Sequence, residues 1–238
     1  MNRKLVLFIG LILACSAAWA SGPSSAVEVL CHARSSPFKP SDAPRLPDDQ
    51  VLRTLLTTEE PALIQQSLLN VDLSAYRGTT KTTPLALAAS VGNLKAVQIL
   101  LRIGAGIDFP TASGATALEA AILNGQAGSA CLLLRQGARL PQPGSRPYLL
   151  PSAALSEDFQ GATALVEFLA AEGYDVNARM NGDTALHIAA GLGNTALVRV
   201  LLRRGADVHA RSGRAETPEM VANRSGNDEV AQLLGKAR

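Results

Sequence analysis

Residues 83–109 read TPLALAASVGNLKAVQILLRIGAGIDF, and residues 184–210 read TALHIAAGLGNTALVRVLLRRGADVHA. The two stretches share a Thr-x-Leu opening, a run of small residues, a glycine nine positions after the threonine, and a later Gly-Ala pair. Apolar residues recur in both at intervals of three and four positions, which is typical of helices that bury one face. Each stretch therefore predicts two short helices joined by a glycine turn and followed by a short extended segment.

This pattern repeats along the chain with a period of 33 residues. The opening threonines are Thr83, Thr116, Thr184 and Thr217, at spacings of 33, 68 and 33 residues. The glycines nine positions later are Gly92, Gly125, Gly193 and Gly226. Several copies in phase indicate units that stack on one another, because a single pair of short helices cannot bury its own apolar face.

The opening residues of these units, TPLALAA and TALHIAA, are close to a T-P-L-H-x-A signature. On this signature and period, residues 48–238 strongly resemble the ankyrin-repeat family. The resemblance implies an all-α fold, a helix-turn-helix solenoid with short β-hairpin fingers. It also implies that His187, which occupies the histidine position of the signature, is structural and hydrogen-bonds to neighbouring backbone.

The resemblance divides the chain into about six units. The first is a degenerate N-terminal cap, with helices expected over 51–56 and 61–69, and the last is a polar C-terminal cap. The fourth unit is irregular, because its first helix, expected over 148–155, has lost the signature and an insertion at 156–160 lengthens the turn before Gly161. The expected unit boundaries are 48–80, 81–112, 113–145, 146–180, 181–212 and 213–238.

Residues 1–20 have the three parts of a secretory signal peptide. Arg3 and Lys4 precede the apolar run LVLFIGLILA, and Ala18-Trp19-Ala20 forms an A-x-A cleavage site. The apolar run is about half of what a helix needs to cross a ~30 Å hydrocarbon core, so no transmembrane span is expected. The sequence favours a free periplasmic protein. The alternative is a membrane-anchored lipoprotein, because LILACS resembles a bacterial lipobox in which Cys15 would carry the lipid.

Residues 21–47 are rich in proline and serine and are expected to form a linker to the repeat domain.

Charge and motif content exclude several classes of function. The chain has 22 basic and 20 acidic residues, and removal of Arg3 and Lys4 with the leader makes the mature chain neutral. Nucleic-acid binding usually needs a basic excess, so it is not expected. Three dispersed histidines and three cysteines offer no zinc ligand set, and no nucleotide-binding or hydrolase motif occurs. No catalytic, cofactor-binding or metal-binding residue is therefore predicted, and Glu119, which replaces the signature histidine in unit three, has no visible partner.

The finger tips are the positions that the repeat framework leaves available for a protein partner. Arginine and aromatic residues, which often dominate interfaces, are frequent there. Their cationic row favours a partner with an acidic surface. The candidate partner-binding residues are Tyr76, Arg77, Lys81, Phe109, Arg146, Tyr148, Arg179, Met180, Arg211 and Arg214.

Cys131 lies six residues after its repeat glycine, where the other units have Gln98, Glu167, Arg199 and Gln232. That register predicts an exposed thiol on the outer side of the second helix. Cys31 is the other cysteine that survives removal of the leader. In an oxidising compartment the two are expected to form a disulfide.

Together these features predict a non-catalytic protein that binds a periplasmic or envelope-associated protein partner on its concave finger and helix surface. One alternative is an immunity-type inhibitor of a toxin delivered to the periplasm. Another is an enzyme with its site in irregular unit four.

Overall fold

The computed structural model describes residues 60–68 and 82–237 of the 238-residue chain. The expected signal peptide, the linker and the helix at 51–56 lie outside these ranges. Among the described residues, no helix has the length and apolar character that a membrane crossing requires.

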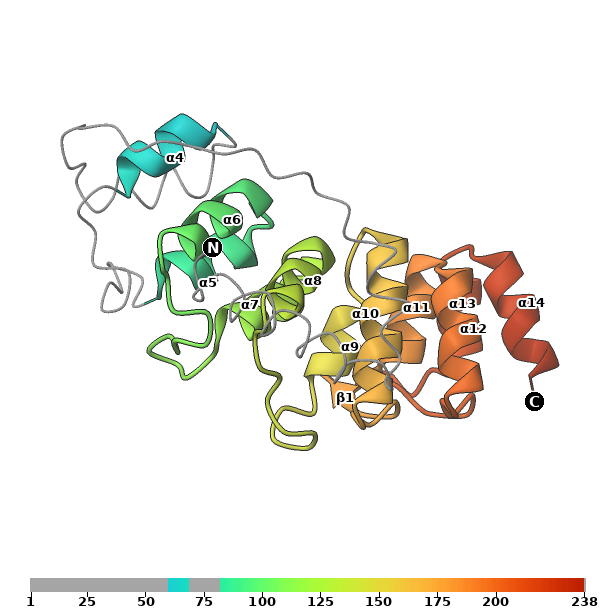
Figure 1. Cartoon of the computed structure of the whole chain (residues 1–238). Coiled ribbons are helices and arrows are strands. Elements are labelled where there is room, and N and C mark those ends of the chain that lie inside the picture. Colours follow the sequence, from blue (N-terminus) through green and yellow to red (C-terminus); the bar gives the residue numbers. More distant parts are fainter. Residues whose placement is uncertain (1–59, 69–81, 238) are drawn as a thin grey trace, which may run out of the picture.

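Short helices in antiparallel pairs make up the described fold. Figure 1 shows the pairs succeeding one another from α4 and α5 at one end of the molecule to α14 at the other. The helices are α4 (Pro61–Ser67), α5 (Pro84–Ser90), α6 (Leu94–Arg102), α7 (Ala117–Leu123), α8 (Ala127–Arg135), α9 (Leu149–Ala153), α10 (Phe159–Ala171), α11 (Ala185–Leu192), α12 (Thr195–Arg203), α13 (Pro218–Arg224) and α14 (Asp228–Lys236). This succession confirms the predicted solenoid of helical pairs.

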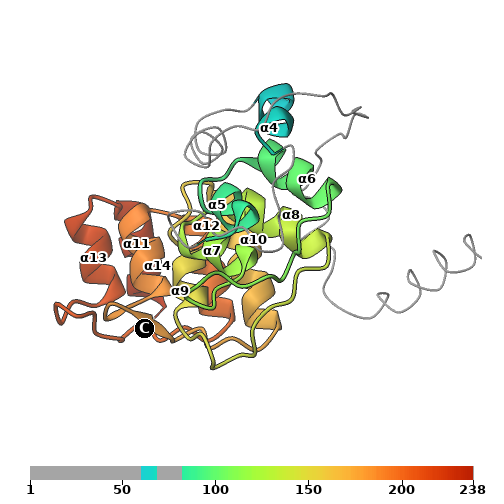
Figure 2. The ribbon, with the colours of Figure 1, turned by 90° about the vertical axis from the view of Figure 1, so that its left-hand side faces the viewer.

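The helices form two layers. In one layer, the first helices of successive units, α5, α7, α9, α11 and α13, contact one another in that order. In the other layer, α4, α6, α8, α10, α12 and α14 do the same, which makes α4 the second helix of the N-terminal unit. The apolar core runs continuously between the layers, from Ile64 to Leu234. Figure 2, which views the stack from its N-terminal end, shows α5, α7, α8, α10 and α12 overlapping and α11, α13 and α14 displaced to one side.

Side-chain caps explain why the helices begin where they do. Thr83, Thr116 and Thr217 accept hydrogen bonds from the amides three residues later, at 3.1, 3.3 and 3.3 Å. These bonds satisfy amides that the first helical turn leaves without a partner. Asn93 and Asn194 cap the second helices α6 and α12 in the same way, each at 3.0 Å.

The predicted glycine turns are confirmed. Gly92, Gly125, Gly193 and Gly226 have φ values of 78°, 67°, 75° and 74°, in the left-handed region that favours glycine. Helices this short need such abrupt ends, because each pair must reverse within a few residues.

Unit four departs from the expected register. α10 begins at Phe159, and Asp158 Oδ1 accepts a hydrogen bond from the Gly161 amide at 3.1 Å, so Gly161 is the third residue of the helix and not the turn glycine. The prediction that Gly161 ends the turn is wrong, because the Asp158 cap starts the helix earlier. The expected first helix is present, shortened to α9.

Hairpin fingers with paired strands were expected between all units. Within 60–68 and 82–237 only one finger pairs strands, β1 (Arg179–Met180) with β2 (Asp183–Thr184), in an antiparallel register. The other described fingers close with turns, such as the bond from the Thr111 amide to the Ala115 carbonyl at 2.8 Å. The arms of these fingers have few residues, so each finger is closed by hydrogen bonds across its turn and not by paired strands.

Candidate protein-binding surface

The finger between α10 and α11 ends in a two-residue turn. Met180 pairs with Asp183 across Asn181 and Gly182, whose φ values are 54° and 91°. Positive φ at both central residues is the type I′ geometry that Asn-Gly favours and that matches the twist of paired strands. The tip of this finger is therefore rigid.

A cleft of about 490 Å³ lies between this finger and the next one. α11 and α13 contribute its apolar floor through Ile188 and Val221, and the two fingers contribute polar walls. The residues that line it are Asn181, Asp183, His187, Ile188, Ser212, Gly213, Arg214, Glu216, Val221 and Arg224. Apolar floor and polar wall together suit a partner's side chains better than an open solvated surface does.

The arginines predicted to bind a partner in this region differ in their hydrogen bonds. Arg179 donates to the carbonyls of Gly182, at 3.0 Å, and of Arg211, and Arg211 donates to the Ala215 carbonyl at 2.9 Å. Both side chains are exposed, but they brace the fingers as well as presenting charge. The exposed side chain of Arg214 makes no hydrogen bond or ion pair with any described residue, so it is the available cation of the cleft.

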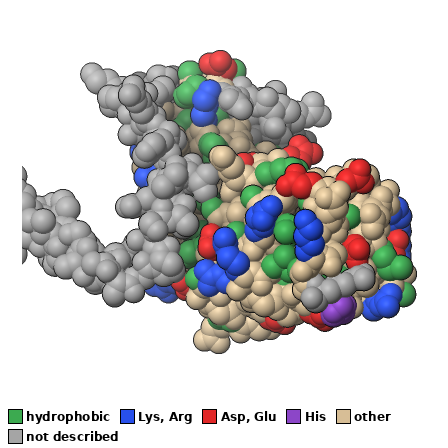
Figure 3. Space-filling model, turned by 90° about the vertical axis from the view of Figure 1, so that its right-hand side faces the viewer, with side chains coloured by type: hydrophobic (Ala, Val, Ile, Leu, Met, Phe, Trp, Pro, Cys, Tyr) green, Lys and Arg blue, Asp and Glu red, His purple; other side chains and the backbone are tan. Residues whose placement is uncertain are grey.

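Glu216 and Arg224, in the same cleft, are already paired. The Arg224 Nε and Nη2 atoms donate to the two carboxylate oxygens of Glu216 at 3.0 and 3.2 Å. The acidic and basic side chains at this C-terminal end are intermingled with apolar ones in Figure 3. The cleft is consequently not a single-sign surface, and Arg214 and Asp183 are its side chains with uncommitted charge.

The remaining predicted tip residues are less available than expected. Phe109, Tyr148 and Met180 are half-buried, Tyr148 packs against the core, and Met180 Sδ accepts a hydrogen bond from Ser152 Oγ at 3.0 Å. The prediction that Tyr148 is an available tip is wrong, because it packs beside the start of α9. Tyr76, Arg77 and Lys81 lie outside the described residues.

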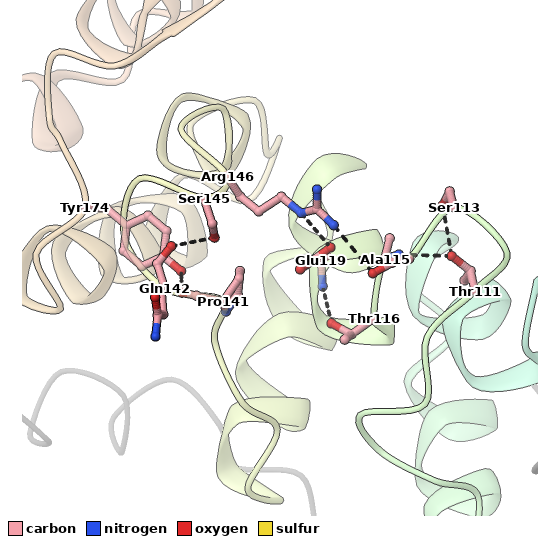
Figure 4. A network of polar contacts seen from close by, with 11 residues as sticks. Thr111, Ser113, Ala115, Thr116, Glu119, Pro141, Gln142, Ser145, Arg146 and Tyr174 are labelled. Carbon is pink, nitrogen blue, oxygen red and sulfur yellow. Dashed lines mark hydrogen bonds and ion pairs between the residues drawn. The ribbon is translucent and has the colours of Figure 1, made fainter.

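The prediction that Arg146 is an available tip cation is also wrong. Its Nε atom lies 3.5 Å from Oε2 of Glu119, whose side chain is only 5% exposed, and its Nη2 atom donates to the Gly114 carbonyl at 3.5 Å. Figure 4 shows the guanidinium folded back over Glu119 between two fingers. Glu119 therefore has a partner that the sequence did not reveal, and Arg146 neutralises a buried carboxylate instead of facing a partner protein.

Tyr174 anchors the finger that carries Arg146. Its phenol donates to the Pro141 carbonyl, as Figure 4 shows. Burial raises the pKa of Tyr174 to about 12, and the negative charges of Glu119 and Glu172 contribute to the rise. All three effects disfavour the phenolate, so the hydroxyl stays protonated and continues to donate.

We expect this raised pKa to appear in an alkaline titration followed by phenolate absorbance. Tyr174 binds its proton more tightly in the folded state, so its contribution to stability is fully present below pH 10. It is lost as the pH rises from 10 toward about 12. Tyr174→Phe removes this phase and is the control. A Tyr174 phase centred near pH 10 in the folded protein would contradict the prediction.

His187 confirms the structural role that the resemblance implied. Its Nδ1 atom accepts from the Thr184 amide at 3.3 Å, and its Nε2 atom lies 3.1 Å from the Glu216 carbonyl of the next finger. The ring is buried and forms a capping box with Thr184. His187 thus joins the start of α11 to the neighbouring unit.

The prediction of an exposed Cys131 is wrong. The thiol is in α8, between α6 and α10, and is 4% exposed. The longer polar side chains at the equivalent positions reach past the edge of the helix to solvent, whereas the short cysteine side chain stays below that edge. The exposure on which a Cys31–Cys131 disulfide was predicted is thus absent, and Cys31 lies outside the described residues.

Comparison with protein families matches residues 50–143 and 152–237 to ankyrin repeats. The chain belongs to the ankyrin-repeat family. The gap between the two matches, 144–151, falls at the irregular start of unit four. Repeats of this family form protein–protein interaction surfaces, and the family is typically non-catalytic.

No curated protein matches this ankyrin-repeat chain. Among solved structures, 434 chains match, so likeness of fold by itself does not identify a partner. One of them belongs to the complex of a predatory endopeptidase from Bdellovibrio bacteriovorus with an immunity protein. It is 26% identical, with a TM-score of 0.56, and the match covers 79% of this chain and 98% of that chain.

Proposed function

We propose that this ankyrin-repeat chain is a non-catalytic protein-binding module of the bacterial periplasm. The observation that carries the proposal is the cleft between the last two described fingers, with its apolar floor and the uncommitted charge of Arg214. The exposed cations Arg179, Arg211 and Arg214 favour a partner with an acidic surface beside this cleft.

The more specific function is that of an immunity-type inhibitor. It is favoured by the solved complex, in which an endopeptidase is bound to an immunity protein, because the match extends over nearly all of that chain. On this proposal the partner is an endopeptidase that acts in the periplasm, and the chain protects its cell by occupying that enzyme.

The test is to recover the natural partner with tagged chain from periplasmic extract and to measure endopeptidase activity with increasing amounts of purified chain. We expect a complex containing an endopeptidase whose activity falls to a plateau at equimolar inhibitor. Undiminished activity in a complex that still forms would contradict the inhibitor function and leave the binding function standing.

The enzyme alternative is less well supported by unit four as folded. Within this unit, Tyr174 donates to a backbone carbonyl with its pKa raised to about 12, and Arg146 is paired with Glu119 of unit three. A general base needs a pKa near the working pH and an open path to its substrate. These side chains instead hold a finger in place.

Charge reversal at Arg214 tests the cleft. We expect Arg214→Glu to weaken binding of the recovered partner about tenfold and to reduce the salt dependence of binding, since a rim cation acts through long-range attraction. Arg203→Glu, a charge reversal at another exposed arginine, on α12 in the other layer, is the matched control and should leave affinity unchanged. Both should change stability by less than about 0.5 kcal/mol. Equal effects of the two on affinity would remove the cleft from the proposal.

Processing of the N-terminus tests the proposed location. Cleavage after Ala20 removes Trp19, the only tryptophan, whereas lipobox processing before Cys15 retains it. We expect the intact mass of the natural protein to begin at Ser21 and its emission spectrum to lack tryptophan. A tryptophan-containing species with acyl chains would instead support the lipid-anchored form.

A further inference from the structure

The finger over residues 136–148, between α8 and α9, ends in an exposed tip. A Cβ built on Gly144 would meet no described atom within 4 Å, whereas one on Gly182 would lie 2.8 Å from Gly213 Cα. The tips of the two fingers beside the cleft thus touch each other at their glycines, whereas Gly144 is open. The ring of the adjacent Pro143 lies beside Gly173, where an added Cβ would be 3.8 Å from Pro143 Cγ. In Figure 1 the loop between α8 and α9 extends beyond the rest of the finger side of the molecule.

The tip itself is a tight turn. The Ser145 amide donates to the Gln142 carbonyl at 3.0 Å, and Ser145 Oγ donates to the same oxygen at 2.7 Å. Pro143 and Gly144 are its central residues, and Gly144 has a φ of 90°. Proline followed by a glycine of positive φ is the type II pattern, in which the proline ring already fixes the first central φ.

Both sides of this turn are tied to the solenoid. On the incoming side, the phenol of Tyr174 donates to the Pro141 carbonyl. On the outgoing side, Arg146 pairs with Glu119 at 3.5 Å and bonds to the Gly114 carbonyl. Figure 4 shows these ties converging on the base of the finger from the two flanking units. The turn is consequently a rigid projection on a braced base.

The chemistry of the tip differs from that of the two following fingers and is shared with the uncharged tip of the preceding one, residues 110–114. Gln142, Pro143, Gly144 and Ser145 are all exposed and uncharged, whereas the following fingers present Arg179, Arg211 and Arg214. A small uncharged projection fits a concave site more readily than a flat charged surface. Its preformed turn also avoids the entropy of ordering a loop on binding.

We infer that the Gln142–Ser145 turn enters the active-site cleft of the endopeptidase, while the cationic fingers contact the enzyme's rim. This inference rests on the proposed inhibitor function and assigns the part of the chain that blocks the enzyme. Pre-organised projections of this kind suit inhibitors, because endopeptidase clefts are concave and the inhibitor backbone moves little on binding.

Photocrosslinking from single positions tests the inference separately from the function on which it rests. A photoreactive p-benzoylphenylalanine replaces Gln142 in one full-length variant and Arg211 in another. Each is irradiated in the periplasm, and the crosslinked peptides are identified by mass spectrometry. We expect the adduct at 142 to join residues lining the endopeptidase active site and the adduct at 211 to join residues outside it.

Inhibition by turn variants supplies a second readout. Pro143→Gly frees the turn without adding bulk, and we expect it to raise the inhibition constant about two- to fivefold. Ser113→Gly at the tip of the preceding finger is the matched control and should leave the constant unchanged. Folding of each variant is checked by its unfolding midpoint.

The outcomes distinguish a failure of this inference from a failure of the proposed function. An adduct at 211 with the endopeptidase, with none from 142 to its active site, overturns the inference and keeps the proposed function. Absence of any endopeptidase adduct from either position overturns both. Unchanged inhibition by Pro143→Gly also overturns the inference, since the turn would then contribute nothing to the block.

Discussion

Leu186→Ala is expected to lower the free energy of unfolding by about 3 kcal/mol. Leu186 is in α11, is fully buried, and belongs to the continuous core between the two helix layers. The substitution removes apolar contacts and leaves a cavity that the neighbouring helices α9 and α13 can fill only in part. Because each unit of a solenoid is stabilised by its neighbours, the loss should lower the stability of the stack on both sides of α11. Urea unfolding followed by circular dichroism measures it.

Leu192→Ala on the same helix is the matched control. Leu192 is 41% exposed at the C-terminal end of α11, so the same substitution there removes little buried surface. We expect a change of less than about 0.5 kcal/mol. Similar losses from both substitutions would show that α11 is not packed as the repeat requires.

Local chemistry explains why most of the fold could be predicted from the sequence. A threonine at a helix start and a glycine nine residues later each act within a few residues, through a cap and through positive φ. Gly92 and Gly193 have the predicted conformation, and Thr83 caps α5. Repetition then carries the local pattern to the whole stack, because similar units offer similar faces to their neighbours.

Unit four shows where this reasoning fails. The glycine at 161 is the one that the sequence places at the end of the lengthened turn, but Asp158 caps α10 three residues earlier and carries Gly161 into the helix. Two local signals competed, and the capping carboxylate decided the register. The burial of Cys131 also differs from the prediction. The repeat register gives only the direction of the side chain, and the short cysteine side chain does not reach solvent in that direction.

The pairing of Glu119 with Arg146 was also missed, although the sequence contained a usable signal. Glu119 occupies a position that is buried in the repeat, as His187 is in its own unit. A carboxylate at such a position requires a cation within reach, and Arg146 follows at the base of the next finger. The repeat pattern predicts that finger residues are available for a partner, whereas Arg146 is committed to the framework.

Arg146→Ala is the second substitution expected to have a large effect, a loss of about 2 kcal/mol in the free energy of unfolding. The reason is the carboxylate of Glu119, which is 5% exposed and would lose the guanidinium 3.5 Å away. Breaking a buried pair from one side costs about 3–5 kcal/mol. The 34% exposure of Arg146 lets water compensate for part of that cost, which brings the expectation down. Equilibrium unfolding in urea near pH 7 measures it.

The matched control is Arg139→Ala, which breaks the Arg139–Asp108 ion pair at 3.8 Å with an arginine side chain that is 90% exposed. Such a pair contributes at most about 1 kcal/mol, so this variant should be close to wild type. Glu119→Gln completes the test, because it removes the buried charge at this position, and in that background Arg146→Ala should cost less than half as much. Equal costs of Arg146→Ala in both backgrounds would mean that the arginine stabilises the finger through the Gly114 carbonyl and packing. In that case a group other than Arg146 would have to stabilise the buried charge of Glu119.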